Sequence, residues 1–129
     1  MYLSQSIQWR NEKLNMVGIV PGDVVVGDRP QGRGYVLLEE TGKSPWTPVC
    51  NKPAGSETAM PAHEFHYARL ENLSAAHEYA YKVARGHGID GNHDGIIIDN
   101  LLAGFAHHRN TAANPWVGRF VTFVREKST

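Results

Sequence analysis

Residues 62–73 of this chain read AHEFHYARLENL. Their side chains alternate with a period of two, which predicts a β-strand with two different faces. One face would carry Glu64, His66, Ala68 and Leu70, and the other would carry His63, Phe65, Tyr67 and Arg69. The first face sets a carboxylate beside an imidazole, a pair that can move protons or hold a polar ligand when it lines a cleft. The alternative is a half-exposed strand whose polar face meets water, and the spacing leaves both readings open.

The composition indicates a single globular domain that has no strong net charge. Of the 129 residues, 41% are hydrophobic and 20% are charged, which is typical of a folded chain. The 13 basic side chains balance the 13 acidic ones, so the sequence predicts no nucleic-acid partner and no membrane partner. The longest apolar runs, at 24–26 and 96–98, are too short to span a bilayer, and no leader is evident. We expect a soluble, cytoplasmic protein, and the single Cys50 fits a reducing compartment.

Outside the central stretch, the pattern predicts further strands and one C-terminal helix. Residues 1–9 have helical spacing and read as the back half of a helix. Short strands are predicted at 15–20, 24–26, 34–39, 78–83, 95–99 and 101–105, the first of them stopped by Pro21-Gly22. The strand at 78–83 would neighbour the central strand in an antiparallel meander, and residues 41–60 would form a surface excursion. A helix starting at Asn114-Pro115 would carry Arg125 and Lys127 at its negative end.

Two ion- or phosphate-binding motifs are incomplete. Asp90, Asn92, Asp94 and Gly95 match the first half of a calcium loop, but Leu101 stands where such a loop requires a bidentate Glu. The glycines between residues 27 and 34 do not form a phosphate-binding motif. The sequence therefore predicts neither a calcium site nor a nucleotide site.

The 7 histidines raise the question of a metal site. On a strand, His63 and His66 would point to opposite faces, and the neighbours His107 and His108 would diverge in the same way. A site could be assembled from His66, His107 and a carboxylate, but no cluster has a familiar zinc spacing, so we predict no metal. The remaining chemical candidates are Glu64, His66 and His107. Cys50 lies in a proline-bounded loop and not in the tight turn that exposes a nucleophile.

Four segments, in this order, carry a family resemblance. They are VGIVPGD at 17–23, RGYV at 33–36, AHEFHYARLENL at 62–73 and HGIDGNHDGIIIDNLLAGFAHHR at 87–109. Together they resemble the C-terminal part of the glutamine amidotransferase domain of cobyrinic acid a,c-diamide synthase, including relatives that amidate sirohaem-type tetrapyrroles. HEFHY is similar to the family's HEFHYS strand, and GFAHH is similar to its SYLHLH segment. The resemblance implies an α/β fold: a partial class I glutaminase-like domain with a strand-rich mixed sheet and a C-terminal helix.

The resemblance also implies a function. In the family, a cysteine supported by a histidine hydrolyses glutamine, and the ammonia serves an ATP-dependent synthetase domain that amidates tetrapyrrole carboxylates. The implied partners are glutamine, the N-terminal synthetase part or subunit, and a tetrapyrrole acceptor. ATP and Mg²⁺ would belong to the synthetase part, so no cofactor is expected in this chain. By position, His107 falls on the first histidine of SYLHLH, whereas Arg109 stands at the second.

The family's cysteine elbow is followed at once by a segment like Met1-Tyr2-Leu3, so we expect the elbow just upstream of residue 1. Residues 1–129 would then be a single, incomplete domain that is inactive by itself and self-associates through its uncovered surface. Class I glutaminases usually carry a third triad member, a Glu two residues after the histidine, where this chain has Arg109. Glu64 is a candidate orienting group in its place, with His66 as an orienting or substrate-binding residue. The alternative for Glu64 is a structural role, either as a carboxylate paired with Arg69 or as a charge at the strand edge. A different function also stays open, namely a non-catalytic module that binds a tetrapyrrole, a metal or a partner.

Overall fold

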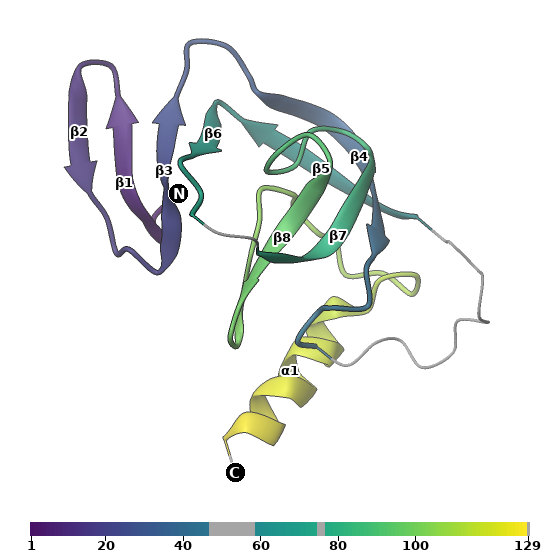
Figure 1. The fold of residues 1–129 in the computed structure, drawn as a ribbon. Coiled ribbons are helices and arrows are strands. Elements are labelled where there is room, and N and C mark those ends of the chain that lie inside the picture. Colours follow the sequence, from purple (N-terminus) through teal and green to yellow (C-terminus); the bar gives the residue numbers. More distant parts are fainter. Residues whose placement is uncertain (47–58, 75–76, 129) are drawn as a thin grey trace.

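The computed structural model describes residues 1–46, 59–74 and 77–128, which form two β-sheets and one helix (Figure 1). The strands are β1 (Ser4–Trp9), β2 (Glu12–Asn15), β3 (Val20–Val26), β4 (Gly32–Glu40), β5 (Met60–His66), β6 (Ala68–Glu71), β7 (Glu78–Arg85), β8 (His93–Ile98) and β9 (Leu101–Ala103). The helix is α1 (Trp116–Lys127). No helix within these ranges is both long and apolar enough to cross a membrane.

The two sheets differ in strand direction. The four-stranded sheet has the order β2-β1-β3-β6 and is mixed, because β1 and β3 run parallel while its other pairs are antiparallel. The five-stranded sheet has the order β5-β4-β7-β8-β9 and is antiparallel throughout. The expected strand-rich α/β chain with a C-terminal helix is thus confirmed, although its strands lie in two sheets.

The central stretch joins the two sheets. The strand predicted at 62–73 is divided at Tyr67, so that β5 belongs to the five-stranded sheet and β6 to the four-stranded one. The main-chain N–H groups of Gln31 and Gly27 donate to the carbonyls of His66 and Tyr67 at 2.8 and 2.9 Å, which holds the chain at this crossing. Ala62 and Ala68 are both buried, so the inward face continues from one strand to the next.

The hydrophobic core has two parts. One is formed by β4, β5 and β7, and its buried residues are Val36, Leu38, Met60, Ala62, Ala80 and Tyr81. The other lies where the two sheets meet, and its buried residues are Val20, Ile89 and Ile96. Buried side chains alternate with exposed ones along β5, as expected for a strand with one face against a core.

Residues 1–9 do not form the predicted helix. Strand pairing places Ile7 opposite Val24 of β3 and opposite Leu14 of β2. Ser4 and Ser6 are buried, and the Ser6 hydroxyl donates to the Asp23 carboxylate, so two small polar residues satisfy their hydrogen bonds inside the sheet. These long-range pairings outweigh a helical spacing that rests on few residues.

The strand predicted at 15–20 is also wrong, because residues 16–19 connect β2 to β3, and β3 runs through Pro21-Gly22 instead of ending there. The register of β1 against β3 shifts between Ser4 and Ser6, and this irregularity accommodates a proline that cannot donate to the ladder. A Cβ at Gly22 would lie 3.1 Å from the Glu71 carbonyl, so the glycine lets β6 approach closely.

Several other predictions are confirmed. The strands at 24–26, 34–39, 78–83 and 95–99 appear within or largely within β3, β4, β7 and β8, and β7, β8 and β9 form a meander. The strand at 78–83 does not neighbour the central strand, because β4 lies between β5 and β7. Arg125 and Lys127 do occupy the last turn of α1. The predicted excursion at 41–60, including Cys50, falls mostly outside the described residues.

Candidate functional site

The two faces of β5 have opposite surroundings. The side chains of Glu64 and His66 point inward and are buried, with 2% and 7% of each residue exposed. His63 and Phe65 point outward and are exposed. The carboxylate and imidazole are therefore on one face, as predicted, but this face meets the protein interior and not water.

Glu64 holds a turn in place. Its Oε1 accepts the main-chain N–H of His87 at 2.8 Å, and its Oε2 accepts that of Gly88 at 2.9 Å. Hydrogen bonds to a buried carboxylate are charge-assisted and strong. Arg69 pairs instead with Glu71, so the alternative of a Glu64–Arg69 pair is wrong. The carboxylate anchors the β7–β8 connection to β5.

His66 is enclosed by its neighbours. Its Nδ1 donates to the Ala68 carbonyl at 2.7 Å, and its ring stacks on Phe105 with centroids 4.2 Å apart. Its Nε2 lies 3.6 Å from Glu64 Oε2 and makes no hydrogen bond within the described chain. A Cβ at Gly32 would come within 2.3 Å of that nitrogen, so β4 packs directly on this pair. The side chains of Glu64 and His66 do not line either of the two cavities between these elements.

His107 lies on the other side of β5, beside His63. The two residues exchange main-chain hydrogen bonds, with His63 N donating to His107 O at 3.1 Å and His107 N donating to His63 O at 2.7 Å. Residues paired directly across an antiparallel bridge point to the same face, and the two ring centroids are 6.2 Å apart. The Tyr35 ring meets the His63 ring edge-on at 6.0 Å. Tyr35, His63 and His107 are all exposed and lie next to one another on this face.

The structure therefore does not bring the three predicted site residues together. Glu64 and His66 share the buried face, and His107 is on the opposite side of β5, so the possible metal site of His66 with His107 does not assemble. Among the described residues, no three His, Cys, Asp or Glu side chains gather in a metal-binding arrangement. The sequence did not single out His63 as a neighbour of His107, because only the strand register joins positions so far apart in the chain.

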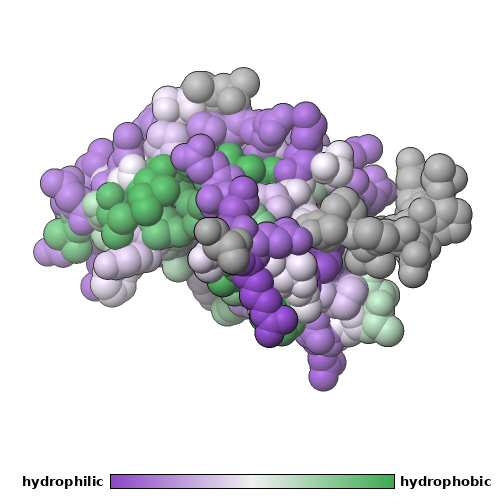
Figure 2. Space-filling view, turned by 90° about the horizontal axis from the view of Figure 1, so that it is seen from below, coloured by the Kyte–Doolittle hydropathy of each residue, from purple (hydrophilic) through white to green (hydrophobic). Residues whose placement is uncertain are grey.

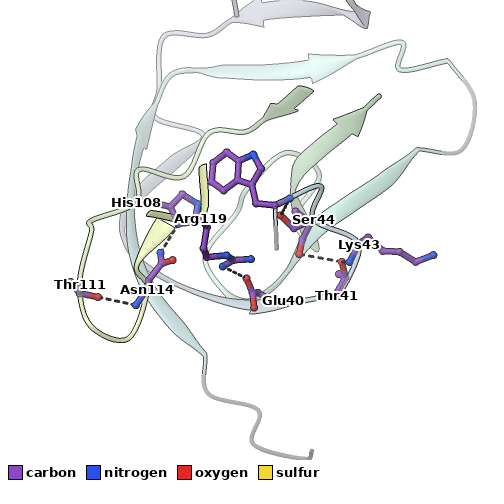
Figure 3. A network of polar contacts seen from close by, with 10 residues as sticks. Glu40, Thr41, Lys43, Ser44, His108, Thr111, Asn114 and Arg119 are labelled. Carbon is purple, nitrogen blue, oxygen red and sulfur yellow. Dashed lines mark hydrogen bonds and ion pairs between the residues drawn. The ribbon is translucent and has the colours of Figure 1, made fainter. Parts of the chain in front are cut away.

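A second polar cluster lies between the five-stranded sheet and α1 (Figure 3). Asn114 Nδ2 and His108 Nδ1 are 3.2 Å apart, and burial lowers the pKa of His108. Asp94 is 1% exposed and accepts the N–H groups of Phe105 at 3.0 Å and Ala106 at 2.9 Å, while burial raises the pKa of its carboxyl group. These contacts fix the chain where it leaves β9 toward His107.

The same cluster contains a largely buried ion pair. Arg119 Nη1 on α1 lies 2.5 Å from Glu40 Oε1 at the end of β4. Asn114 Oδ1 and Trp116 Nε1 are buried and have no hydrogen-bond partner within the described residues. Sequence reasoning missed this cluster, although an arginine among the apolar residues of a helix is a usable signal for a buried ion pair.

Two cavities accompany these elements. A cavity of about 210 Å³ lies beside the second cluster and is lined by Trp46, Tyr81, Asp94, His108 and Trp116, among others. The rings of Trp46 and Trp116 are stacked, with centroids 6.1 Å apart. Burial raises the pKa of Tyr81 to about 12. A smaller cavity of about 60 Å³ lies where the two sheets meet and has a mostly apolar lining.

No protein-family model matches the chain. The chain is 35% identical over 129 residues to the cobyrinate a,c-diamide synthase of Magnetococcus marinus. The aligned region covers 100% of the chain and 26% of that relative. It is 36% identical over 108 residues to the Halobacterium salinarum synthase, covering 83% of the chain and 23% of the relative. For the Archaeoglobus fulgidus synthase the identity is 31%, with 98% of the chain and 26% of the relative covered. The chain thus spans about a quarter of the length of these relatives, and the similarity supports its membership of the cobyrinate a,c-diamide synthase family.

Proposed function

We propose that this chain is the C-terminal part of a glutamine amidotransferase domain that supplies ammonia for the ATP-dependent amidation of tetrapyrrole carboxylates. Cobalamin-type and sirohaem-type acceptors are both compatible with the proposal. The observation that carries it is the placement of His107. This imidazole is exposed, and its main chain is fixed to β5 by two hydrogen bonds, so a group from outside the described residues can reach it.

In the proposed reaction, His107 takes the proton of a cysteine thiol, and the thiolate attacks the carboxamide carbon of glutamine. The imidazolium then gives this proton to the departing amine, which leaves as ammonia. Water hydrolyses the resulting thioester to glutamate and regenerates the thiol. A cysteine is mostly protonated at neutral pH, so the neighbouring imidazole supplies the reactive form.

We further propose that the nucleophile comes from outside residues 1–129. The sole cysteine of the chain, Cys50, lies outside the described residues, and its proline-bounded sequence is not that of a nucleophile elbow. ATP and Mg²⁺ would act in the synthetase part of the protein. Glu64 and His66 would contribute indirectly. Their contacts on the inner face fix the position of β5, and β5 in turn positions His63 and the paired His107.

The proposal is tested in the longer protein that contains this chain together with its elbow and synthetase parts. Replacing His107 by Ala should lower glutamine-dependent amidation by about 10²- to 10⁴-fold, the usual contribution of a positioned general acid–base group. Amidation with free ammonia should be unchanged, because that step does not pass through His107. His77→Ala is the matched control, since His77 Nε2 bonds the Ser74 carbonyl and the residue lies outside the proposed site. Full glutamine-dependent activity in His107→Ala would overturn the proposal.

A further inference from the structure

We propose that His63 and His107 form a binding site for a divalent transition-metal ion, of the zinc, copper or nickel class, on the outer face of the five-stranded sheet. Both rings are exposed, both point to the same face, and their centroids are 6.2 Å apart. No sequence motif joins these residues, because the pair is created by the bridge between β5 and the segment after β9.

The backbone preorganises the pair. The hydrogen bonds of 3.1 and 2.7 Å between the two residues fix the spacing of their main chains, so only side-chain rotation separates the observed arrangement from a chelating one. Two imidazoles that bind one tetrahedral ion have ring centroids about 5 Å apart, given metal–nitrogen bonds of about 2.0–2.1 Å. The observed distance exceeds this by about 1 Å, which exposed rings can close by rotation. The Tyr35 ring packs against His63 and limits the positions that this imidazole adopts.

The ligand chemistry selects the class of ion. Neutral imidazole nitrogen binds zinc, copper and nickel, whereas calcium and magnesium require oxygen ligands. No third His, Cys, Asp or Glu joins the pair among the described residues. Two protein ligands leave the other coordination positions to water or to an incoming group, so this chain should bind the ion in an exchangeable manner.

The site has a consequence that rests on the proposed function. A metal ion on His107 occupies the lone pair that would accept the thiol proton, and a nearby thiolate is itself a strong zinc ligand. Zinc should then inhibit the glutamine-dependent reaction of the longer protein and spare the ammonia-dependent one. Metal binding by the 129-residue chain alone involves no glutaminase chemistry, so the two ideas can fail separately.

The direct test is calorimetric titration of the 129-residue chain with Zn²⁺ and Ni²⁺ at neutral pH, with Mg²⁺ and Ca²⁺ as negative controls. His63→Ala and His107→Ala should each weaken zinc binding by about tenfold or more, because losing a ligand costs at least as much as losing an outer-sphere partner. Both side chains are exposed, and circular dichroism checks that the variants remain folded. Imidazole NMR signals of these two residues, and of no other histidine, should shift first on addition of Zn²⁺.

The control variant is His93→Ala. His93 Nδ1 lies 2.9 Å from Asp90 Oδ2, so this pair is the competing imidazole–carboxylate arrangement on the surface. Zinc affinity should be unchanged in His93→Ala. The proposal is overturned if the His63→Ala/His107→Ala double variant binds Zn²⁺ as tightly as the parent chain, or if His93→Ala is the variant that loses binding.

Discussion

Arg119 and Glu40 form an ion pair that ties the C-terminal helix to the five-stranded sheet, with Nη1 and Oε1 at 2.5 Å (Figure 3). Only 7% and 15% of the two side chains are exposed. Removing one partner of a buried pair costs about 3–5 kcal/mol, because the other charge stays in a poorly solvated site. Arg119→Met should lower the free energy of unfolding by roughly this amount, as measured by urea denaturation.

Two further variants sharpen this prediction. Arg119→Met combined with Glu40→Leu should recover much of the loss, because an apolar pair of similar volume is often as stable as a buried ion pair. Arg125→Met, which changes an exposed arginine on the same helix, should alter stability by no more than about 0.5 kcal/mol. Equal effects of Arg119→Met and Arg125→Met would show that the ion pair does not anchor α1.

His108 should make the fold sensitive to acid. Burial lowers its pKa in the folded state, and among the nearby charges Asp94 and Glu40 oppose this shift while Arg119 and His107 add to it. The unfolded chain, with an ordinary histidine pKa of about 6.5, therefore binds the proton more readily. By linkage, this contribution to stability is present above about pH 6.5 and is lost as the pH falls toward the lower folded-state pKa.

The measurement is the free energy of unfolding over a series of pH values below 7. His108→Asn should flatten the slope in the window that starts at about pH 6.5 and extends downward. Asp94 acts with the opposite sign, because burial raises the pKa of its carboxyl group in the folded state. Its contribution to stability is present below the unfolded-state pKa of about 3.8 and is lost as the pH rises through the higher folded-state pKa. An unchanged slope below pH 6.5 in His108→Asn would contradict the assignment.

Gly32 should not tolerate a side chain. A Cβ there would lie 2.3 Å from His66 Nε2 and 2.7 Å from Glu64 Cδ, and both side chains are buried and held by hydrogen bonds. Gly32→Ala should destabilise the chain by about 1–3 kcal/mol or more, the usual cost of overpacking a core. Gly118→Ala is the matched control, since a Cβ at Gly118 in the first turn of α1 meets nothing within 4 Å. That variant should be stabilised by up to about 1 kcal/mol, and thermal melts of both variants provide the comparison.

The sequence predicted those elements whose pattern is set locally. The alternation in β5 and the helix after Pro115 follow from the spacing of apolar residues and from a proline at the helix start, and both appear in the structure. The strand β1 was missed because its pairing with β3 is a long-range contact that no local pattern reports. In the same way, the pairing of His63 with His107 depends on sheet register, and the buried Asp94 depends on two backbone N–H groups that reach it from a different strand connection.

Self-association of the isolated chain remains a prediction, and the structure suggests where it occurs. Leu14, Val17 and Ile19 are 59, 47 and 49% exposed, and Figure 2 shows apolar surface gathered toward the side of the molecule that carries the four-stranded sheet. We expect a second copy to cover this patch, because contiguous exposed apolar surface favours association. Sedimentation velocity should show species larger than the 14.3 kDa monomer at high concentration. Val17→Ser with Ile19→Ser should shift the distribution to monomer, and a compact monomer at all concentrations of the parent chain would contradict the prediction.

Glu64 offers a test of whether the inner face of β5 acts on His107 directly or only through the strand. In Glu64→Gln, one amide oxygen can still accept the N–H of His87 or Gly88, but the amide nitrogen would face the other donor. An unsatisfied buried donor costs about 1–3 kcal/mol, so urea denaturation should show a loss of this size.

The second measurement is made in the longer protein that we propose, under conditions in which Glu64→Gln stays folded. The pH dependence of glutamine hydrolysis should be the same in this variant as in the parent protein, because Glu64 lies on the opposite face of β5 from His107. A shifted pH profile with normal stability would instead show that Glu64 orients the His107 imidazole electrostatically. His66→Phe makes a useful comparison, since it keeps the stack on Phe105 while removing the nitrogen that faces Glu64.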